Sequence, residues 1–180
     1  MSVRKLFLAM VPVILAGALA GCSDTNKSPA VTDNIRKSLD QAGYKDVSVS
    51  QDREKGVVTL TGTVATEGDK AQAESIAKSG AGAQVVADQI AVRPPGNESD
   101  AKAVDSDVDQ GIEKNLDALL VKNKLQKGVR YDVKNGVVTL KGDVPSQSRR
   151  SQLAKLALTV PNVKQVVNEL EVKNQKASSS

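Results

Sequence analysis

The sequence lacks histidine and tryptophan, and its 180 residues include one cysteine, one phenylalanine and two tyrosines. Without histidine there is no imidazole base, no Ser-His-Asp or Cys-His arrangement and no histidine metal ligand. A single cysteine excludes an internal disulfide and a thiolate zinc cluster. Scarce aromatic side chains argue against the stacking platforms that bind single-stranded nucleic acid. We therefore expect no catalytic residues, no metal site, no small-molecule substrate and no nucleic-acid partner.

The first 21 residues are typical of a secretory signal sequence. Arg4 and Lys5 form a positive region, and an apolar region broken only by Pro12 follows from residue 6 to residue 19. A helix that spans a membrane needs about 20 apolar residues, and this run is shorter. The alternative interpretation is an N-terminal anchor that is not cleaved.

The segment Leu19-Ala20-Gly21-Cys22 resembles the lipobox of bacterial lipoproteins at all four positions. The resemblance implies cleavage before Cys22, a diacylglyceryl group on its thiol and an acyl group on the new amine. We expect these covalent groups and no other cofactor. Two or more acyl chains anchor a protein stably. Ser23 after the cysteine resembles a signal for sorting to the outer membrane, where the protein would face the periplasm. Some bacteria read further positions, so Asp24 leaves sorting to the inner membrane open.

The chain contains an internal repeat. GVVTLTGTV at 56–64 matches GVVTLKGDV at 136–144 with an offset of 80 residues. Two Gln-Val-Val triplets match at an offset of 81, and the helical patterns that start at Ile35 and Ile112 match at an offset of 77. Arrays of short repeats need three or more units, so two copies of about 65 residues indicate tandem domains.

The pattern predicts a tether at 22–29, a first domain at 30–93, a Pro/Gly/acidic linker at 94–106, a second domain at 107–173 and a disordered tail at 174–180. Each domain reads helix, strand, strand, helix, strand, which predicts an α+β fold with a small mixed sheet of three strands against two helices. Thr66 with Asp69, and Ser146, are helix caps by type and position. Asn135-Gly136 indicates a tight hairpin. Gly62 and Gly142 indicate a bulge or a close approach of a helix. Domains this small are marginal alone, so we expect the two to pack together or on a partner.

The repeat resembles the BON family (bacterial OsmY and nodulation). The segment 166–172, VVNELEV, matches the closing strand of that family well, and 85–92 matches it loosely. With the lipobox, the arrangement is similar to the dual-BON outer-membrane lipoproteins of Gram-negative bacteria. The resemblance implies two αββαβ domains, no enzymatic activity, binding of anionic phospholipid by the first helix of the second domain, and support of outer-membrane integrity.

The distribution of charge agrees with that implication. Residues 108–173 contain 12 basic and 7 acidic side chains, a net charge of +5, whereas residues 30–93 have a net charge of −1. On a helix over 108–124 the face opposite the apolar stripe carries an aliphatic pair among lysines, which predicts contact with anionic phospholipid. The candidate residues are Lys114, Val121, Lys122, Lys124 and Leu125. The alternative is a solvated surface with one stray valine.

Two further charged segments have ordinary structural explanations as well as functional ones. Arg149 and Arg150 stand in the first turn of the last helix, where they oppose the helix dipole, so they are secondary candidates for anion contact or an ordinary solvated pair. The segment 105–111 resembles the start of a calcium loop, but its glycine comes one position late and its twelfth position is Leu116. Asp105 or Asp107 is expected to cap the helix instead.

The sequence thus predicts an envelope lipoprotein that binds anionic phospholipid such as phosphatidylglycerol or cardiolipin. One alternative is a periplasmic protein-interaction or chaperone-like module in envelope stress, which would use the same exposed aliphatic residues. A third is binding of an envelope polysaccharide, against which the scarcity of aromatic residues argues.

Overall fold

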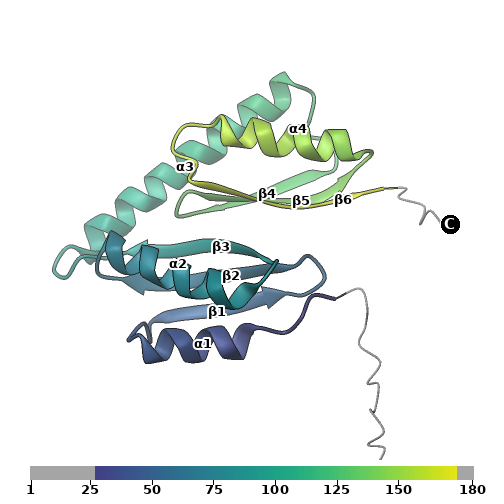
Figure 1. Cartoon of the computed structure of the whole chain (residues 1–180). Coiled ribbons are helices and arrows are strands. Elements are labelled where there is room, and N and C mark those ends of the chain that lie inside the picture. The colour runs from purple at the N-terminus through teal and green to yellow at the C-terminus, as the bar shows by residue number, and fades with distance from the viewer. Residues whose placement is uncertain (1–26, 174–180) are drawn as a thin grey trace, which may run out of the picture.

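The computed structural model describes residues 27–173 (Figure 1). The expected signal sequence 1–21, the expected lipid site Cys22 and the expected tail 174–180 lie outside the described residues. The elements follow in the order α1 (Thr32–Gln41), β1 (Val47–Asp52), β2 (Val57–Val64), α2 (Glu67–Ala81), β3 (Val85–Val92), α3 (Glu98–Lys122), β4 (Val129–Lys134), β5 (Val137–Val144), α4 (Gln147–Leu158) and β6 (Gln165–Val172).

Each repeat forms its own three-stranded sheet, with its second strand in the middle. β1 pairs with β2 antiparallel and β2 pairs with β3 parallel, and β4, β5 and β6 repeat both pairings. α1 and α2 cover one face of the first sheet, and α3 and α4 cover one face of the second (Figure 1). The predicted fold class, two tandem αββαβ domains with mixed sheets, is confirmed.

Local signals form as predicted. Thr66 and Asp69 make a capping box, in which each side chain accepts a hydrogen bond from the other residue's backbone N–H. Ser146 caps α4 by accepting a backbone N–H of its first turn. Asn135 and Gly136 take φ values of 50° and 80° between β4 and β5, the left-handed pair that a two-residue hairpin turn requires.

Gly62 and Gly142 mark a close approach of two backbone segments. Their φ values are +116° and +113°. A Cβ at Gly62 would collide with the carbonyl of Asp46, and one at Gly142 with the carbonyl of Gly128. Glycine is therefore required where the loop after the first helix of each domain enters the sheet, and the approaching segment is this loop rather than the expected helix.

The strand register corrects one part of the expected repeat. Val57 pairs with Val85, and Val137 pairs with Gln165. The last strands therefore match at an offset of 80, like the strands before them, and the offset of 81 read from the Gln-Val-Val triplets is wrong. A run of similar residues can be aligned one position off, although such a shift would move every side chain to the other face.

The first helices also match differently from the expectation. The Tyr44 N–H donates to the Leu39 carbonyl, and the Leu125 N–H donates to the Leu120 carbonyl, so both helices end in the same way. These ends are 81 residues apart, and the offset of 77 is wrong by one helical turn. An apolar stripe that recurs every turn can be shifted by four residues and still match.

The segment expected as a linker at 94–106 is mostly helix. α3 begins at Glu98 and continues for 25 residues, so the break between the domains is confined to its first four residues. Asn97 stands at the N-cap without a side-chain bond. Asp105 and Asp107, the residues expected to cap the helix, lie inside it instead.

Two contacts hold the first half of α3. The Arg93 guanidinium donates a hydrogen bond to the Asp105 carboxylate. The Asp109 carboxylate accepts the backbone N–H groups of Asn135 and Gly136 at 2.7 and 2.9 Å. These bonds join the helix to the end of β3 and to the β4–β5 turn. They therefore fix the direction of the N-terminal turns by which α3 is longer than α1.

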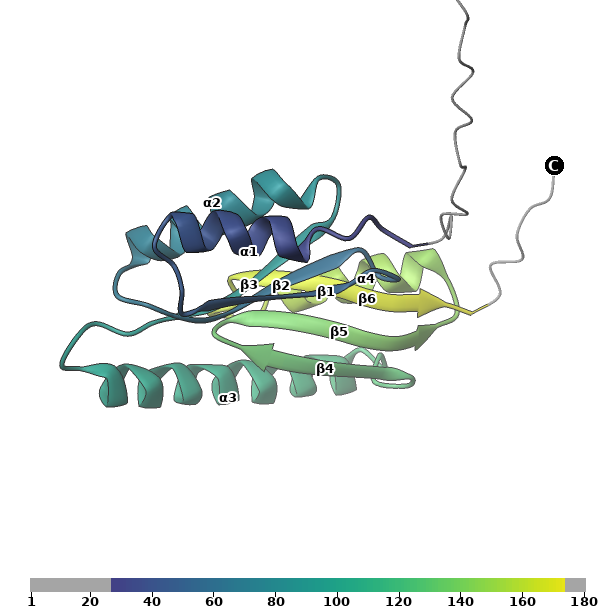
Figure 2. The ribbon, with the colours of Figure 1, turned by 90° about the horizontal axis from the view of Figure 1, so that it is seen from below.

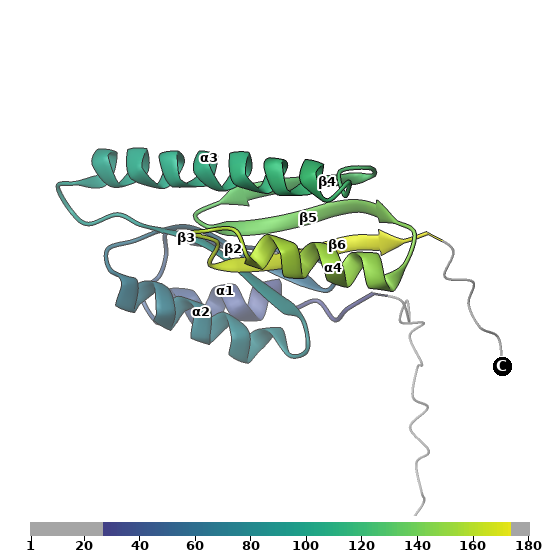
Figure 3. The ribbon, with the colours of Figure 1, turned by 90° about the horizontal axis from the view of Figure 1, so that it is seen from above.

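The outer faces of the two sheets pack on each other, as expected from the small size of each domain. Val57, Ala87, Val137 and Val167 form a buried cluster between them. In the 80-residue register Val57 corresponds to Val137, and Ala87 corresponds to Val167. β3 leads toward the start of α3 whereas β6 runs the opposite way (Figure 3). The two domains are therefore related by an approximate two-fold axis.

One glutamine breaks this symmetry. The Gln165 side chain donates to the Val86 carbonyl at 2.7 Å and accepts the Asp88 N–H at 3.1 Å. It occupies the outer edge of β3 as a neighbouring strand would. The corresponding residue of the first domain is Val85, which is 47% exposed and has no polar atom to offer β6.

Candidate functional site

The C-terminal end of α3 is closed by a Schellman motif. The Lys124 N–H donates to the Val121 carbonyl at 3.0 Å, and the Leu125 N–H donates to the Leu120 carbonyl at 2.8 Å. Lys124 has a φ of 54°, in the left-handed region that usually requires glycine. This turn directs Leu125 back onto the helix, where it is 2% exposed in the core of the second domain.

Leu125 is therefore not part of the exposed face, and its prediction as a phospholipid-binding residue is wrong. The prediction assumed that the helix continues to residue 125 with 100° per residue, whereas the left-handed turn ends it at Lys122. The corresponding turn of the first domain has Gly43 with a φ of 93°. A glycine would have revealed the turn in the sequence, but a lysine does not.

The other predicted residues of α3 are exposed. Lys114 and Val121 lie on one face because seven residues make almost two turns. Val121 is 58% exposed, Lys122 is the last residue of the helix and Lys124 follows it in the turn. Val121, Lys122 and Lys124 thus meet at one end of the domain, and Lys114 lies about 10 Å behind them along the helix.

Arg149, from the first turn of α4, lies at the same end. Its Nη2 donates to the Lys124 carbonyl at 3.0 Å, so the two helix ends are tied together. Lys127, which the sequence prediction missed, is exposed in the loop that follows. We call Lys122, Lys124, Lys127 and Arg149 the basic end.

Arg150, the other secondary candidate, is engaged inside its own domain. Its Nη2 donates to the Asn168 carbonyl at 2.9 Å, and the Asn168 amide donates back to the Arg150 carbonyl at 3.1 Å. The corresponding Lys70 of the first domain likewise donates to the Ile90 carbonyl at 2.7 Å. In both domains this basic side chain joins the second helix to the edge of the last strand.

The profile of the BON domain family matches the chain twice, over residues 27–94 and 108–174. The chain belongs to the BON domain family. Its first BON domain contains α1 to β3, and its second contains β4 to β6 with α4 and the C-terminal half of α3.

Two relatives carry the resemblance over most of the chain. Osmotically-inducible protein Y of Escherichia coli (strain K12) is 29% identical over 147 residues, which are 80% of this chain and 72% of that protein. A protein of Anaplasma centrale, named "Uncharacterized protein in gshII 5'region", is 28% identical over 149 residues, which are 82% of this chain and 95% of that protein. In contrast, the C-terminal domain of CdsD, a structural protein of the Type III secretion system of Chlamydia trachomatis, is 13% identical with a TM-score of 0.33, covering 79% of this chain and 65% of that one, and this likeness carries no argument.

The two BON domains differ most in charge at the end where their helices meet. The first BON domain has Gly43 where the second has Lys124, Asp69 where it has Arg149, and Asp40 where it has Val121. The first domain thus replaces two cations and an exposed valine of the second by a glycine and two carboxylates.

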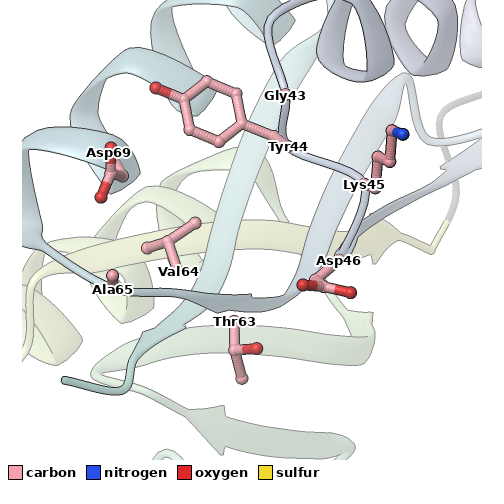
Figure 4. A pocket seen from close by; sticks show the side chains of 8 residues that line it. All are labelled: Gly43, Tyr44, Lys45, Asp46, Thr63, Val64, Ala65 and Asp69. Carbon is pink, nitrogen blue, oxygen red and sulfur yellow. The ribbon is translucent and has the colours of Figure 1, made fainter. Parts of the chain in front are cut away.

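Figure 4 shows this end of the first BON domain, a hollow of about 240 Å³. The residues that line it are Gly43, Tyr44, Lys45, Asp46, Thr63, Val64, Ala65 and Asp69. Two carboxylates and one ammonium therefore surround a hollow that has no cationic cluster. The corresponding ends of the two domains therefore differ in the sign of their local charge.

The basic end and the segment that leads into α1 lie on the same side of the molecule. Figures 2 and 3 show the C-terminal end of α3, the start of α4 and the purple segment that leads into α1 at the same end along the direction of α3. The two-fold arrangement turns the corresponding end of the first BON domain to the opposite side. Cys22 precedes residue 27 by five residues in the sequence.

Tyr131 lies beneath the middle of α3 and contributes no charge to this surface. Burial, with a hydrogen bond to Asp117 and the nearby Asp117 and Glu113 carboxylates, raises the pKa of Tyr131 to about 12. Its hydroxyl also donates to the Glu113 carbonyl at 3.4 Å. The phenol therefore stays neutral and acts as a packing residue of the second BON domain.

Within residues 27–173, no helix is long and apolar enough to cross a membrane. In the same described range, no three His, Cys, Asp or Glu side chains gather in a way that could hold a metal ion.

Proposed function

We propose that the protein is a non-catalytic lipoprotein of the outer membrane, facing the periplasm and attached through Cys22, whose second BON domain binds anionic phospholipid through the basic end. In this role it supports the integrity of the outer membrane. The observation that carries the proposal is the difference in charge between the corresponding ends of the two domains. Only the second domain has four cations beside an exposed Val121, and a surface that merely faces solvent does not explain this difference.

The electrostatic contribution of the basic end and the effect of the lipid anchor together support this binding. A lysine or arginine near an anionic membrane surface contributes about 1 kcal/mol. Four such side chains together still bind weakly, but a lipid anchor on Cys22 raises the local concentration of the surface and makes the contact effectively intramolecular. Val121, exposed beside Lys122 and Lys124, is suited to shallow insertion between headgroups.

The relatives support the setting of this function. The printed name of the Escherichia coli relative links that protein to osmotic induction. We infer a role in osmotic or envelope stress for this chain as well. A protein that contacts the membrane through a salt-sensitive charged surface is suited to conditions in which the envelope is strained.

Vesicle sedimentation tests the lipid site. The full chain should bind vesicles of phosphatidylglycerol more strongly than vesicles of phosphatidylcholine, and less at high salt. Reversal of Lys114, Lys122 and Lys124 to Glu should weaken binding at least tenfold. The matched control reverses the exposed residues Lys37, Lys45 and Lys102 to Glu, which changes the net charge equally. Equal losses in both variants would show a global charge effect and reject the site.

The anchor has a separate test. Mass spectrometry of the N-terminal peptide purified from membranes should find Cys22 as the first residue, with acyl groups on both its sulfur and its amine. An unmodified thiol would reject the anchor while leaving the phospholipid site to be judged by the vesicle experiment.

A further inference from the structure

β6 is an edge strand, and the backbone groups of its even-numbered residues point away from the sheet. The strand order β4-β5-β6 leaves no strand beyond it. The Lys173 N–H donates to the Val144 carbonyl of β5 at 2.8 Å, so odd positions face β5. Because donors and acceptors of successive residues alternate in direction along a strand, the N–H and carbonyl groups of Leu170 and Val172 face outward.

The first BON domain closes the same part of its edge strand β3. The Ile90 carbonyl accepts from Lys70 at 2.7 Å, and the Ile90 N–H donates to the Asp88 carboxylate at 3.0 Å. The Val92 carbonyl accepts from Arg93 at 2.9 Å. Side chains thus satisfy three of the four outward backbone groups of Ile90 and Val92 and leave only the Val92 N–H open, and such covering protects a strand from pairing with another chain.

The second BON domain leaves the corresponding part of β6 open. Arg150, the counterpart of Lys70, bonds to the Asn168 carbonyl, two residues before Leu170, which is the counterpart of Ile90, and Lys173 forms an ion pair with Asp143. Within residues 27–173, the Leu170 carbonyl and both backbone groups of Val172 accept or donate no hydrogen bond. An acceptor, a donor and an acceptor therefore follow one another along this edge.

A hollow of about 350 Å³ lies along the open edge. The residues that line it are Glu54, Lys55, Gln147, Arg150, Asn168, Glu169, Leu170, Glu171 and Val172. The start of α4 forms one wall and the β1–β2 turn of the first domain forms the other, so the edge lies at the bottom of a slot between the two domains.

We propose that this slot binds an extended segment of another polypeptide chain, which adds a strand beside β6 at Leu170–Val172. Unpaired backbone groups in this order match the N–H, carbonyl and N–H of an extended segment, and main-chain bonds provide the affinity in such strand addition. Glu169 has no ion pair within the described residues, whereas Glu171 pairs with Lys55. A basic side chain on the partner segment, facing the first domain, is therefore favoured.

The test uses the full chain, labelled with ¹⁵N and ¹³C in detergent micelles, and a capped heptapeptide in which Val alternates with Thr and a central Lys. In the free protein the Val172 amide should exchange with solvent faster than the Ile90 amide. Saturating peptide should slow its exchange at least tenfold and shift the carbonyl carbons of Leu170 and Val172. A Val172 amide that is already protected in the free chain would overturn the proposal, because a segment of the chain itself would then fill the slot.

Two controls separate strand addition from other binding. The same peptide with alternate backbone nitrogens methylated cannot donate hydrogen bonds to β6, and it should therefore bind about tenfold more weakly. Val172→Pro should also abolish binding, whereas Val92→Pro, the equivalent change on the closed edge, should leave it unchanged. Equal binding of the methylated peptide would reject the proposal whatever the proline variants do. The lysine variants of the vesicle experiment should bind the peptide normally, so the two proposals fail independently.

Discussion

The guanidinium of Arg149 donates a hydrogen bond to the Lys124 carbonyl, and this bond joins the end of α3 to the start of α4 in the second BON domain. Arg149 corresponds to Asp69, which completes a capping box in the first domain. An arginine in the first turn opposes the helix dipole, and an aspartate agrees with it. The second domain therefore keeps a less stabilising residue at this position.

Arg149→Asp should separate stability from binding. With Ser146 it should rebuild the capping box of the first domain, so the midpoint of thermal unfolding should stay equal or rise. Binding to phosphatidylglycerol vesicles should fall, since the basic end loses one cation and gains an anion. Circular dichroism and vesicle sedimentation measure the two effects. Unchanged binding would remove Arg149 from the site.

Lys124→Gly should also raise stability and weaken vesicle binding, in this case through the conformation of the backbone. A left-handed φ of 54° costs a lysine more than a glycine, and the corresponding residue is Gly43. We expect unfolding in urea to show a gain of about 1 kcal/mol in stability, with weaker vesicle binding. Lys124→Asn, which tolerates this conformation and also lacks the charge, should bind vesicles as weakly as the glycine variant.

Asp88→Asn should change how stability depends on pH. Burial raises the pKa of the Asp88 carboxyl, and this outweighs the Ile90 N–H and the Lys70 ammonium, which lower it. A folded-state pKa above the unfolded value means that this group stabilises the fold at low pH. That contribution is lost as the pH rises through the folded pKa, so the ionised carboxylate costs stability at neutral pH.

The variant should therefore be at least as stable as the parent at pH 7, and this advantage should shrink as the pH falls through the Asp88 pKa. The amide can still accept the Ile90 N–H, as Asn168 accepts the Leu170 N–H in the second domain. Urea unfolding at several pH values measures the difference. The reverse change, Asn168→Asp, is the matched control and should add a pH dependence of the same sign.

Val85→Gln should give β6 the side-chain hydrogen bonds that β3 receives from Gln165 and that Val85 cannot make. Its amide can reach the edge of β6 as Gln165 reaches the edge of β3. We expect a gain of about 1 kcal/mol in unfolding free energy. Gln165→Val should instead cost about 2 kcal/mol, because it leaves the Asp88 N–H and the Val86 carbonyl without partners. If the double variant does not recover part of this loss, the domains do not pack by an approximate two-fold axis.

The elements of the fold could be predicted because their signals are local. Thr66 with Asp69, and Asn135 with Gly136, specify a cap and a turn through the backbone geometry of a few residues. The alignment of the repeats does not follow from the sequence alone, because apolar periods still match after a shift by one turn or one position. The strand pairs Val57–Val85 and Val137–Gln165 resolve that shift, since they depend on contacts far apart in the sequence.

The candidate site could be predicted in part. Lys122, Lys124 and Val121 share one stretch of chain, so their nearness follows from the sequence. Leu125 could not be placed, because the left-handed lysine before it gives no signal. The partners of Arg149 and Arg150 come from other elements, and which carbonyl each guanidinium reaches depends on how α4 packs.

A duplicated protein with a two-fold axis ordinarily offers two identical poles and can bridge two surfaces. Here the poles carry opposite character, since Asp69 and Gly43 stand where Arg149 and Lys124 stand on the other side. If the basic end binds phospholipid as proposed, one molecule contacts one bilayer and does not link two, so adding the protein to anionic liposomes should leave the suspension clear rather than aggregated.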